Sequence, residues 1–202
     1  MRPLHLAILI SGRGSNMQTL LRVAEAPDFP ARPVLVVSNR PGAPGLEAAA
    51  AAGIATTCID HTAFGGDREA FERALDATLR KANVEIIALA GFMRVLTPWF
   101  VKAWAGRMVN IHPSLLPKYP GLKTHERAIA AGDTHAGCSV HWVTEGADEG
   151  DVIAQARVSI KPDDTPETLA ARVLVAEHEL YPRALAEACR MITQQTQKSP
   201  QP

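Results

Sequence analysis

The chain has 202 residues, of which 47% are hydrophobic, so it can bury one good core, and nothing in its length requires a second domain. Lys plus Arg and Asp plus Glu each number 21, which gives a formal net charge of zero. A chain without net charge has no global field that would draw it to nucleic acid or to a membrane surface. The composition therefore favours a small ligand held by local contacts.

Cysteine content and hydropathy predict a cytoplasmic protein. The three cysteines, Cys58, Cys138 and Cys189, are an odd number without CxxC spacing, which favours free thiols in a reducing compartment. The apolar stretch 6–10 is too short for the core of a signal peptide. Every other apolar run is far below the roughly 18 residues that a membrane span needs.

Short apolar runs alternate with helical patterns along the first half of the chain. Leu6–Ile10 is a continuous apolar run stopped by Ser11 and Gly12, as is typical of a strand buried on both faces of a parallel sheet. Met17, Leu20, Leu21 and Ala24 then recur at helical spacing. Further strands are expected at 34–37, 56–59 and 86–90, and further helices at 45–52 and 67–81. This rhythm predicts right-handed βαβ units, hence a single-domain, Rossmann-like α/β fold with a mostly parallel twisted sheet and helices on both faces.

The pattern changes after the next strand, 108–112, which Pro113 ends. Residues 136–144 and 152–160 look like two longer strands joined by the acidic loop 145–151, and we expect them to form an antiparallel edge of the sheet.

The chain closes with a predicted helix, 165–191. Thr165 suits the N-cap, Pro166 the first helical position and Glu167 the first turn, whereas Pro182 should kink or break the helix. The residues from Thr193 onward are polar, so we expect a domain of residues 1–192 and a disordered tail of residues 193–202.

A glycine-rich segment, Ser11–Asn16, lies between the first strand and the first helix. Glycines let the backbone approach an anion there, and the helix N-terminus offers unpaired N–H groups, so the segment suits a phosphate or phosphomonoester. It is neither a dinucleotide fingerprint, because Met17 stands where the third glycine would be, nor a P-loop. A tight turn with a helix cap would explain the same residues.

Asn110 and His112 are two apart on one strand, so their side chains leave the same face, at the carboxyl end where open α/β sheets bind ligands. An imidazole exchanges protons near neutral pH, and a carboxamide donates a hydrogen bond without changing charge, so the pair suits a tetrahedral intermediate. Asp148 lies in the 145–151 loop, where a carboxylate beside His112 would stabilise the imidazolium. The spacing alone leaves open whether the two meet, and a histidine at a strand end can also be purely structural.

Three blocks, Ser11–Asn16, Ala90–Arg94 and Asn110–Pro117, closely resemble the folate-dependent phosphoribosylglycinamide formyltransferases of purine synthesis. The resemblance extends from about His5 to Arg190. It implies formyl transfer from 10-formyltetrahydrofolate, as co-substrate, to the amine of 5′-phosphoribosylglycinamide, without a metal. It further implies that Asn110 and His112 hold the oxyanion, and that Asp148 keeps His112 charged and assists proton transfer.

The resemblance also implies binding residues. Those for the ribotide are Gly14, Ser15, Asn16 and Glu177. Those for the folate are Arg68, Met93, Arg94, Val95, Leu96 and Asn110, with Phe92 packed beside the pterin pocket. Arg68 and Glu177 could instead be ordinary surface charges, and Phe92 and Met93 could belong to the core. One departure affects the catalytic loop, because Asp151 follows Asp148-Glu149-Gly150 where the family usually has proline.

Three other functions fit parts of this pattern. A methionyl-tRNA formyltransferase adds a C-terminal tRNA-binding domain, for which this neutral chain has no room. A formyltetrahydrofolate hydrolase carries an extra N-terminal domain and usually a histidine where Pro113 stands. A non-catalytic phosphosugar-binding module would leave the Asn110, His112 and Asp148 trio unexplained. The seven histidines show no metal-binding spacing, so no metal is expected, and either a monomer or a homodimer is compatible with the sequence.

Overall fold

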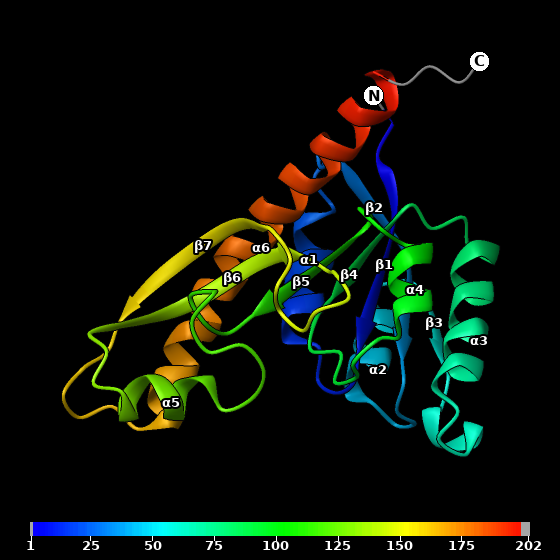
Figure 1. Ribbon diagram of the computed structural model, residues 1–202. Helices are drawn as coiled ribbons and strands as arrows, with labels where there is room; N and C mark the ends of the chain where they lie inside the picture. Colours follow the sequence, from blue (N-terminus) through cyan, green and yellow to red (C-terminus); the bar gives the residue numbers. More distant parts are fainter. Residues whose placement is uncertain (1, 199–202) are drawn as a thin grey trace.

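The structure is a computed structural model that describes residues 2–198. Seven strands form one sheet in the order β3-β2-β1-β4-β5-β6-β7 (Figure 1). The strands are β1 (Leu4–Ile10), β2 (Ala31–Ser38), β3 (Ala55–Cys58), β4 (Ile86–Leu89), β5 (Met108–His112), β6 (His135–Trp142) and β7 (Val152–Ser159). The first five pair in parallel, and β6 and β7 add antiparallel pairs at one edge. The expected single-domain α/β architecture and its antiparallel edge are confirmed.

Helices cover both faces of this sheet. They are α1 (Ser15–Val23), α2 (Pro44–Ala51), α3 (Arg68–Lys81), α4 (Pro98–Ala103), α5 (Thr124–Ala130) and α6 (Pro166–Lys198), with a short 3-10 turn, η1 (His61–Phe64). Side chains of α1, α2, α5 and α6 enter one hydrophobic cluster, and side chains of α3 and α4 enter the other. None of the helices within residues 2–198 is long and apolar enough to cross a membrane.

The continuous apolar run of β1 follows from its place at the centre of the sheet. Leu6, Ile8 and Ile10 pack into the cluster under α1 and α6, whereas Ala7 and Leu9 pack into the cluster under α3. Successive strand side chains point to opposite faces, so a strand covered on both sides needs apolar residues at every position.

Helix α6 differs from the expected helix in its length. It runs through Pro182 without the break that was one of the two expected effects of that proline, and it continues to Lys198, beyond the expected end at residue 191. Tyr181 and Ala184 are buried on either side of Pro182, and their packing offsets the roughly 3 kcal/mol that an interior proline costs. In the last turns, Thr193 and Thr196 donate to backbone carbonyls four residues back. Residues 199–202 of the expected tail lie outside the described residues.

The N-terminus of α6 agrees with the sequence, whereas two short helices differ from it. Thr165 acts as the expected N-cap, because its hydroxyl accepts from the Thr168 N–H at 3.3 Å. The short helices α4 and α5 were not predicted, since six and seven residues give too few turns for a clear helical period.

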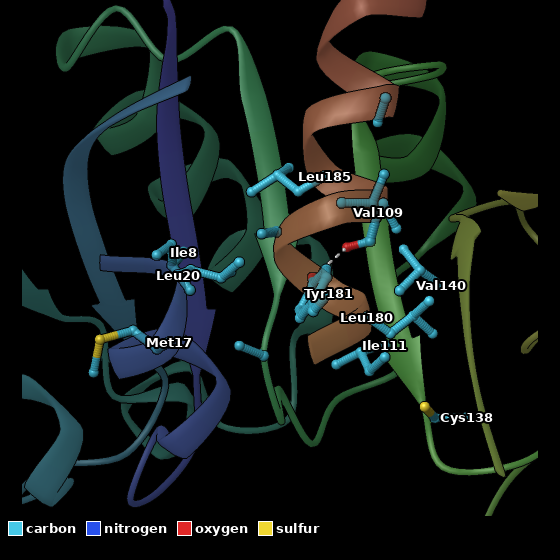
Figure 2. Packing of buried hydrophobic residues seen from close by; sticks show 14 of the residues in the cluster. Ile8, Met17, Leu20, Val109, Ile111, Cys138, Val140, Leu180, Tyr181 and Leu185 are labelled. Carbon is cyan, nitrogen blue, oxygen red and sulfur yellow. Dashed lines mark hydrogen bonds between the residues drawn. The ribbon is translucent and has the colours of Figure 1, made fainter. Parts of the chain in front are cut away.

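Tyr181 fixes α6 to the centre of the sheet. Its ring is fully buried, and its hydroxyl lies 2.9 Å from the Leu89 carbonyl oxygen. The same hydroxyl lies 3.3 Å from the carbonyl oxygen of Val109, which Figure 2 shows beside it. The helix is therefore tied to β4 and β5, the two strands that lead into the loops described below.

We expect Tyr181→Phe to lower the free energy of unfolding by about 1–2 kcal/mol, because a buried acceptor loses its hydrogen bond while the ring packing remains. Urea unfolding measures this change. Val175→Ala, at a 60% exposed position of the same helix, should stay within about 0.5 kcal/mol of wild type. A Tyr181→Phe variant as stable as wild type would contradict the proposed tie.

Candidate active site

Three loops meet where β1, β4 and β5 end, which is the edge at which open α/β sheets bind ligands. They are residues 11–14 after β1, residues 90–97 after β4 and residues 113–123 after β5. The loop between β6 and β7, residues 143–151, reaches the same edge from the antiparallel side.

Asn110 and His112 project from β5 as the alternation predicts. Antiparallel pairing places Asn110 opposite His141 and His112 opposite Ser139 on β6. The His112 side chain is 7% exposed, so water has little access to its ring.

Asp148 approaches both of these residues. Its Oδ2 lies 3.3 Å from His112 Nδ1, its Oδ1 lies 3.5 Å from Asn110 Nδ2, and the Gly121 N–H donates to Oδ2 at 2.9 Å. The structure therefore brings together the three residues that the sequence singled out.

The backbone of the Asp148 loop is tightly constrained. Asp148 itself has a positive φ of 58°. A side chain at Gly150 would collide with the Trp142 carbonyl. The turn closes through a 3.0 Å hydrogen bond from the Trp142 N–H to the Asp151 carbonyl. Because the side chain at position 151 takes no part in that hydrogen bond, the loop closes with aspartate at the position where the resemblance implies proline.

Both ring nitrogens of His112 face acceptors. Nδ1 faces Asp148, and Nε2 lies 3.0 Å from the Tyr119 carbonyl oxygen. An imidazole that donates from both nitrogens is doubly protonated, so this arrangement suits the imidazolium. The site can thus hold a proton beside a bound ligand.

The surroundings of the Asp148 carboxyl shift its pKa in opposite directions. Burial alone would raise its pKa, but hydrogen bonds from His141 and the Gly121 N–H, with the nearby His112 and His141 rings, lower the pKa below the usual aspartate range. Asp148 is accordingly held as a carboxylate, the form that can pair with an imidazolium.

Sequence reasoning missed His141 as part of this site. The side chain is 3% exposed, and its Nε2 lies 3.5 Å from Asp148 Oδ1 and 3.2 Å from Asn110 Nδ2. Its position opposite Asn110 gives it the same sheet face. Aligning the expected antiparallel strands residue by residue would have found it, but the register could not be fixed without the structure.

The glycine-rich loop runs directly into α1. Gly14 has a φ of 68° and precedes Ser15 and Asn16, which form the first turn. Asn16 Nδ2 donates to Glu177 Oε2 at 2.7 Å, whereas the buried Asn16 Oδ1 has no partner. Burial raises the pKa of Glu177 despite the Asn16 hydrogen bond. A buried acceptor without a partner beside a buried carboxyl suits a ligand that carries hydroxyl or amine donors.

The residues expected to bind folate lie on or beside the 90–97 loop. Met93 and Val95 are 63% and 66% exposed, whereas Phe92 and Leu96 are buried. Arg94 stacks over the Phe71 ring, with its guanidinium carbon 5.3 Å from the ring centroid. Neighbouring exposed apolar side chains at a ligand-binding edge suit a flat aromatic ligand.

Arg68 is occupied within the protein. Its guanidinium donates to the Val95 carbonyl, so in this structure it fastens the 90–97 loop to α3. In the described part of the chain, no group of three or more His, Cys, Asp or Glu side chains is arranged to hold a metal ion.

Comparison with known proteins connects this geometry to one family. The formyl transferase family model matches residues 4–185. The phosphoribosylglycinamide formyltransferase of Escherichia coli (strain K12) is 44% identical over 183 residues, which is 91% of this chain and 86% of that protein. The trifunctional purine biosynthetic protein adenosine-3 of Drosophila melanogaster is 50% identical over 182 residues, but the chain spans only 13% of its length.

Solved structures agree with the sequence matches. The crystal structure of phosphoribosylglycinamide formyltransferase from Brucella melitensis has a TM-score of 0.89 and 52% identity, covering 93% of this chain and 96% of that one. The chain therefore belongs to the formyl transferase family.

Proposed function

We propose that this protein is a phosphoribosylglycinamide formyltransferase of de novo purine (IMP) biosynthesis. It transfers the formyl group of 10-formyltetrahydrofolate to the amine of 5′-phosphoribosylglycinamide by direct attack through a tetrahedral intermediate. The observation that carries the proposal is the convergence of Asn110, His112 and Asp148 at one loop-lined sheet edge. Both reactants are small molecules, and we place the reaction in the cytoplasm.

Asn110 and His112 stabilise the negative oxygen that forms when the amine attacks. Asn110 Nδ2 carries two protons. One has only a long 3.5 Å contact with Asp148 Oδ1, and the other can reach a developing oxyanion, because His141 Nε2 donates to Asp148 and so cannot accept it. His112 Nε2 must exchange its hydrogen bond to the Tyr119 carbonyl for one to that oxygen.

Asp148 keeps His112 in its charged form and assists proton transfer. Its lowered pKa leaves it ionised at neutral pH, and its contact with Nδ1 orients the ring so that Nε2 faces the reaction. The role needs no metal, because the charge that stabilises the oxyanion comes from the imidazolium.

The remaining residues hold the reactants. Gly14, Ser15 and Asn16 offer the α1 N-terminus to the ribotide phosphate, and Glu177 accepts hydrogen bonds from the ribotide. Met93, Arg94, Val95 and Leu96 form the wall against which the pterin lies, and Asn110 borders it. Arg68 contributes by holding this wall through Val95 rather than through a free guanidinium.

A formyl-transfer assay tests the reaction. Wild type should turn over 5′-phosphoribosylglycinamide with 10-formyltetrahydrofolate, followed by folate absorbance, and His112→Ala and Asp148→Asn should each lower kcat/KM roughly 10²-fold or more. His135→Ala, an exposed histidine outside the site, serves as the matched control and should retain wild-type rates.

The same assay separates the alternatives. Folate consumed equally well without the ribotide would indicate a formyltetrahydrofolate hydrolase, and ligand binding without turnover would indicate a non-catalytic phosphosugar-binding module. Either result would overturn the transferase proposal.

Glu177 gives a pH-dependent prediction. The pKa of Glu177 is higher in the folded protein than in the unfolded chain. Below the ordinary carboxyl pKa of about 4.3 the group is protonated in both states and does not reduce stability. As pH rises from there through the raised pKa, the folded protein loses stability. Glu177→Gln cannot ionise, so its unfolding free energy relative to wild type should rise between about pH 4 and pH 7.5.

Urea unfolding at the two pH values measures this difference. Glu187→Gln, at an exposed position of the same helix, controls for general effects on α6. A Glu177→Gln difference that stays constant with pH would show that the carboxyl does not titrate abnormally.

Ribotide KM should also rise in Glu177→Gln while folate KM stays near wild type.

A further inference from the structure

Ser11 joins the two substrate loops. It directly follows β1 as the first residue of the glycine-rich segment, and its backbone N–H donates to the Gly91 carbonyl at 3.1 Å. Its hydroxyl oxygen accepts the Met93 N–H at 2.8 Å. The loop that follows β4 is thus fastened to the end of β1 through both the backbone and the side chain of one residue.

The direction of each hydrogen bond follows from the number of protons. A serine hydroxyl has one proton, and the Met93 contact uses Ser11 Oγ as an acceptor, so the hydroxyl proton must go to the other neighbour. That neighbour is Asn39 Oδ1, at 2.5 Å. Ser11 is 7% exposed and Asn39 is 1% exposed, so if one side chain is removed, water has little access to the polar group left without its hydrogen bond.

Asn39 is held in place in turn. It follows β2, and its backbone carbonyl oxygen lies 2.7 Å from His61 Nδ1 at the start of η1. The chain of contacts from His61 through Asn39 and Ser11 ends on the backbone of Met93.

The far end of the 90–97 loop has its own fastening. Glu72, 1% exposed on α3, accepts the Thr97 N–H at 2.7 Å and also the Thr97 hydroxyl. Between these two ends lie the exposed side chains of Met93 and Val95. The loop is therefore fixed at its ends by buried polar groups and open in the middle.

We propose that Ser11 and Asn39 are positioning residues for the formyl donor, setting the backbone of Met93 without touching either substrate. This inference rests on the proposed function, in which Met93–Leu96 line the pterin pocket. Ser11 lies three residues before Gly14, so a purely structural role in the β1 loop would disturb the ribotide site as well. If the two residues instead position the Met93 backbone, their loss should weaken mainly the binding of the folate.

The test compares Ser11→Ala and Asn39→Ala with Ser38→Ala. Ser38 is fully buried next to Asn39, but among the described residues its hydroxyl bonds only to the backbone of Arg40, so it reports general damage at the end of β2. Losing one buried hydrogen bond should raise KM for 10-formyltetrahydrofolate by about threefold to tenfold. KM for the ribotide should stay within about twofold in both variants, and Ser38→Ala should change neither.

A binding measurement without turnover accompanies the kinetics. Calorimetric Kd for tetrahydrofolate, the deformylated product, should rise by the same factor in Ser11→Ala and Asn39→Ala. Circular dichroism checks that each variant folds, and if Ser11→Ala does not fold, the Asn39→Ala result decides.

Equal folate KM and Kd values in the Ser11, Asn39 and Ser38 variants would overturn the inference while leaving formyl transfer intact. A rise in ribotide KM as large as the rise in folate KM would also overturn it. If wild type does not transfer formyl, the proposed function fails by itself. The tetrahydrofolate Kd then decides the inference alone, with weaker binding than Ser38→Ala in its support and equal binding against it.

Discussion

The antiparallel pairing of β5 with β6 is the constraint on which the site depends. It sets Asn110 against His141 and directs the chain beyond Trp142 into a loop that returns to β5. That loop delivers Asp148 to His112. A shift of one residue in this register would turn His141 to the other face of the sheet and separate the carboxylate from both of its neighbours.

Burial gives this small polar group its chemical character. His112 and His141 are almost inaccessible to water, and a charge pair in such surroundings interacts more strongly than it would on the surface. Each polar atom then needs a partner, and backbone groups of residues 119 and 121 supply two of them. The loop after β5 is consequently part of the electrostatic site as well as its cover.

The sequence predicted the elements that have a clear period and missed those that depend on tertiary contacts. The apolar run of β1 and the helical spacing of α1 and α3 identified the parallel core. The continuation of α6 through Pro182 was not predictable, because buried packing outweighs the local preference of proline to end a helix.

The site divides in a similar way. The two-residue spacing of Asn110 and His112 predicted one face, but the register that adds His141 and the guanidinium contact that occupies Arg68 appear only when distant segments meet. The roles of Ser11 and Asn39 are equally invisible in sequence, since their partners lie on other loops.

Helix α6 carries Glu177 and Tyr181 four residues apart, a separation of about 6 Å along one face. Glu177 accepts a hydrogen bond from Asn16 in the first turn of α1, and Tyr181 is tied to the strands beneath. The Glu177 carboxyl is thus held on the same helix turn that is tied to the sheet, so a shift of this turn would move the contact with α1 and the contact with the sheet together.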